Sequence, residues 1–211
     1  MAEIRSNFVL AISRQYGSGG RGIGKKIADE LGIGCYDKEL ITLTAEKSGL
    51  SQSYVENSEE RVDNGFMSSM SFNAYHGFDS IGYYETPTTD KMFIAQSEVV
   101  REIAAQGACV IIGRCADYVL RHEPNLIRVF IRADTEDRIQ RAIESYELPR
   151  KNAIKYVKKA DKARSNYYRF YTNRTWGDPE HEDLIINSSY CGSAGVVELI
   201  KKFLQVKGYI A

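Results

Sequence analysis

A glycine-rich segment near the N-terminus has the composition of a phosphate-binding loop. Residues 13–24 read SRQYGSGGRGIG. They follow an apolar run at residues 8–12, which predicts a buried strand, and they precede a helical pattern at residues 27–31. Such a strand, turn and helix bind phosphate because backbone N–H groups gather in the turn and the helix N-terminus carries partial positive charge. Glycine permits positive φ angles and close approach of the anion. The residues predicted to hold phosphate are Gly17, Ser18, Gly19, Gly20, Arg21 and Gly22.

The segment departs from the usual phosphate-loop pattern, G-x-x-x-x-G-K-[ST], at the two positions that carry side-chain chemistry. With Gly19 as the last glycine, Gly20 stands at the lysine position and Arg21 at the hydroxyl position. We expect Arg21 to supply the missing positive charge and Ser18 to supply a hydroxyl as the candidate metal ligand. The alternative interpretation is a turn that serves only the packing of helix against sheet.

Polar residues also follow three later apolar runs. Asp37 ends residues 33–37, Arg114 follows residues 108–112, and Asn187-Ser188 ends residues 183–187. Ligands of parallel sheets bind beyond the carboxyl ends of the strands, so we expect these residues to converge with the glycine-rich loop. Asp37 could instead cap the next helix, and Arg114 could instead form a structural salt bridge.

The elements that must position these residues alternate along the chain. Apolar runs predict strands at residues 8–12, 33–37, 108–112, 126–132 and 183–187. Helical patterns lie between them, at residues 38–48, from Ser51, from Thr88 or Thr89 to Gly107, from Asp134 or Thr135 to Pro149, and after a polar turn at Ser188-Ser189. Strands alternating with helices predict an α/β fold with a doubly wound, five-stranded parallel sheet.

Composition narrows the class of protein. The chain has 211 residues, which suits one domain over residues 1–211, and a hydrophobic fraction of 43%. Acidic and basic residues balance to zero net charge, which argues against nucleic acid or an anionic membrane as the main partner. No apolar run approaches membrane-spanning length, and the N-terminus lacks an apolar secretion core. We therefore expect a cytoplasmic protein with reduced thiols at Cys35, Cys109, Cys115 and Cys191.

Two segments have unusual composition. Residues 64–87 mix glycine with aromatic side chains, which favours an interface, such as that of a homodimer, over the lining of a base pocket. Residues 150–176 are basic with interleaved tyrosines, which predicts a mobile lid that places positive charge over a phosphate. Within it we expect Asp161 to pair with Arg164, three residues later, and to orient it. Most of the lysines there are better explained as a solvated helix face, and RNA binding is the less favoured alternative.

The sequence resembles the cytidylate kinase-like family, divergent relatives of bacterial cytidylate kinase within the nucleoside monophosphate kinase fold. The resemblance covers nearly the whole chain and rests on residues 12–22, Tyr36-Asp37, the run IGRCAD at 112–117, DKAR at 161–164 and IINSS at 185–189. It implies a P-loop kinase fold with strand order 2-3-1-4-5. It also implies an acceptor-binding insert at residues 49–106, a basic lid at residues 150–176, and the cofactors ATP and Mg²⁺.

The resemblance also implies roles for single residues. Gly113-Arg114 matches the G-R-D motif whose arginine binds the acceptor phosphate, with Cys115 at the aspartate position. The run 161–164 is similar to the lid motif D-S-x-R, whose arginine reaches the transferring phosphate. Residues 186–189 match a segment beside the adenine site. Asp37 matches the aspartate that opens an acceptor motif, but Lys38 and the residues after it differ, so the acceptor pocket differs too.

Together these patterns predict ATP-dependent phosphoryl transfer to a nucleoside monophosphate or a related small phosphorylated acceptor. Arg21, Arg164 and Asp161 are the predicted catalytic residues, and Asp37 and Arg114 the predicted substrate-binding residues. The alternative is a nucleotide-binding sensor or partner protein of the same fold that has lost catalysis, since the loop lysine and hydroxyl are missing.

Overall fold

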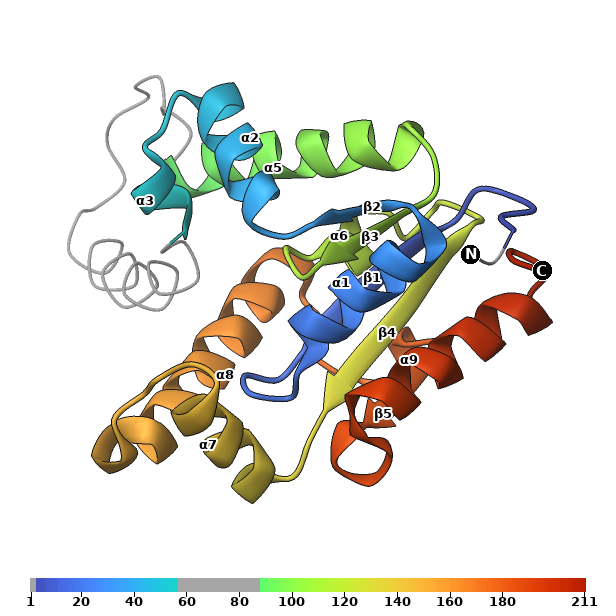
Figure 1. Ribbon diagram of the computed structural model, residues 1–211. Helices are drawn as coiled ribbons and strands as arrows, with labels where there is room; N and C mark the ends of the chain where they lie inside the picture. Colours follow the sequence, from blue (N-terminus) through green and yellow to red (C-terminus); the bar gives the residue numbers. More distant parts are fainter. Residues whose placement is uncertain (1–2, 57–87) are drawn as a thin grey trace, which may run out of the picture.

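The computed structural model describes residues 3–56 and 88–211 and contains a five-stranded parallel sheet (Figure 1). Its strands are β1 (Val9–Arg14), β2 (Gly34–Tyr36), β3 (Cys109–Ile112), β4 (Leu126–Arg132) and β5 (Leu184–Asn187). They are arranged in the order β2-β3-β1-β4-β5, and each neighbouring pair is parallel. The predicted fold class and strand order are confirmed.

Helices cover both faces of the sheet. They are α1 (Gly20–Leu31), α2 (Lys38–Ser48), α3 (Gln52–Glu56), α5 (Thr88–Ala105), α6 (Ala116–Val119), α7 (Thr135–Glu144), α8 (Arg150–Thr172) and α9 (Ser188–Val206), with a short 3₁₀ turn at Pro179–His181. Side chains of β1 alternate between two cores: Leu10 and Ile12 pack with α1 and α9, whereas Val9 and Ala11 pack with α2, α5 and α6. Two buried faces explain why the strand is a continuous apolar run.

Strand β1 lies at the centre of the sheet and ends at the edge where ligands bind in this class of fold. Its register with β4 runs from Val9↔Leu126 to Arg14↔Ile131, so the strand continues two residues beyond the predicted apolar run. Arg14 is therefore the last residue of the central strand, directly before the glycine-rich loop.

The helix boundaries follow local chemistry. Helix α2 has its predicted bounds, and the Ser51 hydroxyl accepts a hydrogen bond from the Tyr54 N–H at 3.2 Å, as expected of a residue that caps α3. The predicted turn at Ser188-Ser189 is wrong, because these residues begin α9. The Asn187 side chain accepts the Ser189 N–H at 3.1 Å and so caps the helix at that point, and non-helical Gly192 kinks it one turn later.

Other predictions meet the structure only in part. The aromatic segment at residues 64–87, with its predicted interface, lies outside the described residues. All four cysteines are free thiols, and burial raises the pKa of Cys35 to about 11. No helix among those described has the length and apolar character needed to span a membrane.

Candidate functional site

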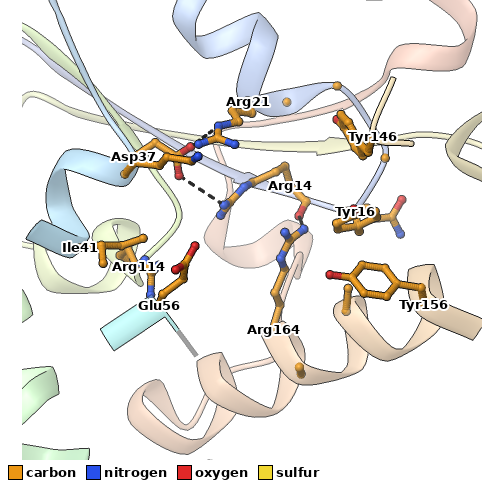
Figure 2. Close-up of a pocket in the computed structure, with 17 residues that line it drawn as sticks. Arg14, Tyr16, Arg21, Asp37, Ile41, Glu56, Arg114, Tyr146, Tyr156 and Arg164 are labelled. Carbon is orange, nitrogen blue, oxygen red and sulfur yellow. Dashed lines mark hydrogen bonds and ion pairs between the residues drawn. The ribbon is translucent and has the colours of Figure 1, made fainter. Parts of the chain in front are cut away.

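A cavity of about 530 Å³ lies at the carboxyl end of the sheet, between the glycine-rich loop and helices α2, α3 and α8 (Figure 2). Its lining comes from segments that are far apart in the sequence: Arg14, Gln15, Tyr16, Gly17, Gly19, Gly20, Arg21, Asp37, Lys38, Ile41, Glu56, Arg114, Tyr146, Tyr156, Ala160, Ala163 and Arg164. The structure thus brings together most of the predicted site residues.

The loop between β1 and α1 has the backbone of an anion-binding turn. Gly17 and Gly19 adopt φ angles of 79° and 82°, in the left-handed region. A Cβ at Gly17 would lie 2.5 Å from the backbone oxygen of Arg138, so only glycine fits there. Gly19 is the N-cap of α1 and provides no side-chain hydrogen bond to the first turn. The N–H groups of that turn and the helix dipole therefore face the cavity side of the loop without a side-chain cap.

Ser18, the predicted metal ligand, has a structural position. Its side chain is fully buried, and its hydroxyl donates to the Gln15 carbonyl at 2.9 Å. The Ser188 hydroxyl donates to the Ser18 carbonyl at 2.7 Å, which ties the loop to the start of α9. Because Ser18 is not part of the cavity lining, the structure gives metal ligation by its hydroxyl no support.

The partners of Asp161 are the glycine-rich loop and α7, and not Arg164. Its carboxylate accepts the Tyr16 N–H at 2.7 Å and forms an ion pair with Arg138 of α7. Arg138 is nearly buried and also donates to the Tyr16 carbonyl at 3.3 Å. The expected pair with Arg164 gives way to these partners because this part of α8 packs against the loop.

The sequence reasoning missed two arginines of α7. Arg138 binds Asp161, and Arg141 donates a hydrogen bond to the Gly17 carbonyl. Their spacing of three residues places both on one face of α7, and this pattern was the available signal. Both helices of the α7–α8 hairpin therefore contact the loop (Figure 1).

Arg164 points from α8 toward the cavity. Its Nη1 donates to the carbonyl of Arg14 at 3.1 Å, and its guanidinium carbon lies 5.5 Å from the centre of the Tyr16 ring. Tyr16 also packs edge-on against Tyr146 and Tyr156, with ring centroids 5.5 and 5.2 Å away. Burial, followed by the neighbouring tyrosines, raises the pKa of Tyr16. This tyrosine cluster joins loop and hairpin around Arg164, and the sequence indicated only that such tyrosines pack.

Asp37 lies between two arginines. Arg21 pairs with its Oδ2, and Nη2 of Arg14 lies 3.8 Å from its Oδ1. The carboxylate makes no cap hydrogen bond to α2, so the structure does not bear out the capping alternative. The Arg21 side chain is 54% exposed, whereas that of Arg14 is 17% exposed.

Arg114 lies on the other side of the cavity from Tyr146, beside Glu56 and Ile41 (Figure 2). Its backbone has a φ of 59°, its Nη1 lies 3.4 Å from the carbonyl of Val55, and its own carbonyl accepts a hydrogen bond from Gln96 at 3.2 Å. Buried Gln96 also donates to the Tyr167 hydroxyl, so Arg114 is held by both α5 and α8.

Asn187, like the predicted residues Ser18, Gly22 and Asp161, is not part of the cavity lining. Its amide donates to Asp134 Oδ1 at 2.9 Å, and it caps α9.

The lining has an excess of positive charge. Its cations are Arg14, Arg21, Lys38, Arg114 and Arg164, and its carboxylates are Asp37 and Glu56. A partly enclosed cavity with this balance attracts anions such as phosphates. For a metal ion the fit is weaker, because Asp37 already pairs with two arginines and the described residues contain no group of three or more His, Cys, Asp or Glu arranged to hold one.

Comparison with known proteins is consistent with this geometry. The cytidylate kinase-like family matches residues 9–190. Comparison with curated protein sequences finds no match.

Solved structures share the fold. The chain is similar to an uncharacterized protein from Eubacterium ventriosum at 26% identity and a TM-score of 0.68, covering 94% of this chain and 98% of that one. It is also similar to shikimate kinase from Acinetobacter baumannii in complex with shikimate, at 14% identity and a TM-score of 0.53, covering 96% and 95%. A shikimate kinase from Bacteroides thetaiotaomicron gives 12% identity and a TM-score of 0.53, covering 95% and 99%.

Proposed function

The chain belongs to the cytidylate kinase-like family, and on this premise we propose that it transfers a phosphoryl group from ATP to a nucleoside monophosphate or a related small phosphorylated acceptor. The observation that carries the proposal is the cavity in which an uncapped helix N-terminus faces arginines from three other segments. Phosphoryl transfer depends on positioning and on positive charge around the transferring oxygens, and this cavity offers both.

The donor phosphates bind at the loop in this proposal. The N–H groups of Gly17 and of residues 19–22 surround them, whereas that of Ser18 donates to the Gln15 carbonyl, and the N-terminus of α1 adds its dipole. Arg164 approaches from α8 and neutralises charge on the transferring phosphoryl group, for which its planar fork is suited. Arg21, half-exposed at the rim, adds charge from the open side.

The acceptor binds at the opposite side. Arg114 takes its phosphate, and Asp37 accepts a hydrogen bond from its polar groups while it remains paired with Arg21. In this proposal residues 49–106 are the acceptor-binding insert, and α3 is the part of it that reaches the cavity among the described residues. The short α3 places Glu56 at the cavity wall, next to Arg114.

Residues 150–176 act as the lid. Asp161 is a positioning residue: it fixes the loop through the Tyr16 N–H and fixes α7 through Arg138. When the lid is closed in this way, the tyrosine cluster excludes water from the reacting phosphate.

Magnesium is the expected companion of the donor. It is usually held by phosphate oxygens and water with one or two carboxylates, and it shields phosphate charge. Asp37 is paired with Arg14 and Arg21, and Glu56 is the other carboxylate that lines the cavity. We therefore assign magnesium binding mainly to the nucleotide itself and not to Ser18.

A nucleotide sensor without catalysis is the second candidate. The observation that favours it is the loss of both the lysine and the hydroxyl at positions 20 and 21 of the loop. Such a protein would bind the donor and turn nothing over.

A coupled ADP-release assay over a panel of nucleoside monophosphates separates the two candidates. The kinase predicts turnover that depends on one class of acceptor and falls when Arg114 is replaced by methionine. Exposed Arg5→Met, before β1 and beside the C-terminal segment, is the matched control and leaves turnover unchanged. ATP binding without turnover on any acceptor contradicts the kinase and supports the sensor.

A further inference from the structure

We infer that Arg14 takes the place of the missing loop lysine and binds the donor phosphates, and that Gly20 is a glycine because a side chain there would meet the stem of Arg14. The inference rests on the proposed function and names a residue that the loop pattern does not assign. Arg14 occupies the first glycine position of that pattern, where a side chain is unusual.

The first observation is the contact between positions 14 and 20. A Cβ at Gly20 would lie 2.6 Å from the Cβ of Arg14 and 3.1 Å from its Cγ. A lysine at position 20 and an arginine at position 14 are therefore mutually exclusive on this backbone. Both positions line the cavity, and the two stems would start within 2.6 Å of each other.

The second observation is the space that the guanidinium fills. A Cβ at Gly113 would overlap Nη1 of Arg14, and Gly113 has a φ of 69°. The turn after β3 is thus shaped around the arginine head. Two neighbouring segments, the loop at Gly20 and the turn at Gly113, lack side chains at the points where Arg14 passes them.

The third observation is electrostatic. Arg14 lies in the cavity between Asp37 and Arg164, as Figure 2 shows. Asp37 holds Arg21 closely and Arg14 at 3.8 Å, so this carboxylate faces two guanidinium groups. Arg164 donates to the carbonyl of Arg14, which places both arginines on the same side of the loop.

Arg21 fits the lysine role less well than Arg14. Its side chain is 54% exposed and bound to Asp37, whereas the Arg14 side chain is 17% exposed. A less exposed guanidinium interacts more strongly with phosphate, because solvent screens it less. We therefore assign the lysine role to Arg14 and leave Arg21 at the rim.

Titration calorimetry with ATP tests the assignment on the full chain. Arg14→Met keeps the apolar stem and removes the charge, and it is expected to weaken ATP binding roughly 10- to 100-fold, the range of a charge-assisted hydrogen bond. Arg21→Met is expected to weaken it several-fold less, and exposed Arg5→Met, before β1 and outside the cavity lining, is the matched control without effect. Equal loss in the Arg14 and control variants, or a larger loss for Arg21→Met, overturns the assignment.

Exchange of the two positions gives the second arm. Gly20→Lys alone is expected to lower both thermal stability and ATP affinity, because its Cβ meets Arg14. The double variant R14G/G20K restores the usual pattern and is expected to bind ATP within a few-fold of the wild type. If R14M does not fold, the double variant decides: a folded double variant that has lost ATP binding overturns the inference. If the wild-type protein itself binds no nucleoside triphosphate, the proposed function fails, a result distinct from wild-type binding that R14M leaves intact.

Discussion

Asp161→Ala is expected to lower the free energy of unfolding by about 3 kcal/mol, since it leaves a buried cation without its partner and removes a charge-assisted hydrogen bond. The Arg138 side chain is 8% exposed and that of Asp161 18%, so solvent replaces the lost interaction poorly. The Tyr16 N–H loses its acceptor in the same variant. Asp161→Asn keeps an acceptor for that N–H and is expected to cost less.

A double-mutant cycle isolates the contact between α8 and α7. The variants are D161A, R138M and the double, and the expected coupling is roughly 1–3 kcal/mol, as for residues in one buried network. Urea unfolding is followed by the emission of Trp176, the single tryptophan, which packs against Phe130 of β4 with ring centroids 5.0 Å apart. The affinity of the same variants for ATP is measured by calorimetry and is expected to fall when the contact of Asp161 with the loop and Arg138 is removed.

The control for this cycle is an ion pair on the surface. Lys47 of α2 bridges Glu98 and Glu102 of α5, and Lys47→Ala is expected to change stability by less than about 1 kcal/mol. Asp161 does not hold the lid against the loop if D161A lowers the free energy of unfolding no more than this control does. The same conclusion follows if the effects of the two single variants are additive.

Three further predictions concern other parts of the site and the fold. Gly17→Ala is expected to destabilise the protein more than Gly208→Ala, because the new methyl group at position 17 meets the backbone of α7. Gly208 has the same positive φ but open space around it, so it is the control. Urea unfolding of both variants measures the difference, and equal losses of stability would contradict the close contact between Gly17 and α7. Burial, followed by the nearby charge of Asp117, raises the pKa of Glu182 from 4.5 to about 8. The stability that the protonated carboxyl provides is therefore complete below pH 4.5 and is lost as the pH rises toward 8. Unfolding at several pH values is expected to show this loss of stability in the wild type and a flatter pH profile in Glu182→Gln. Arg114→Met is expected to raise the KM for the acceptor at least tenfold while ATP affinity changes little; an equal loss in both places Arg114 outside the acceptor side.

The fold was predictable because its signals are local. The five apolar runs became the five strands, and the bounds of β4 and α2 matched the pattern to the residue. The strand order came from the family resemblance rather than from periodicity. The start of α9 was missed because its cap, Asn187, lies at the end of a strand-like run and the two serines after it suggested a polar turn.

The site was predictable only in part, because side-chain partners depend on packing between distant segments. The loop, Asp37, Arg114 and Arg164 were found from their places at strand ends or in the basic segment, and all of them line the cavity. The partner of Asp161 was not found, because Arg138 lies on another helix, α7, and no local sequence pattern specifies how that helix approaches the loop.

The role of Arg14 was hidden for a related reason. In the sequence it is simply a residue that breaks the loop pattern. Only the contact of its side chain with position 20 connects the arginine at the first glycine position with the glycine at the lysine position.

The most direct test of the account is a crystal structure of the protein with a non-hydrolysable ATP analogue. The account predicts that phosphate oxygens lie within hydrogen-bonding distance of the N–H groups of Gly17 and residues 19–22 and of the guanidinium groups of Arg14 and Arg164. An analogue bound away from this loop, or a loop filled by protein atoms with no room for a triphosphate, would contradict it.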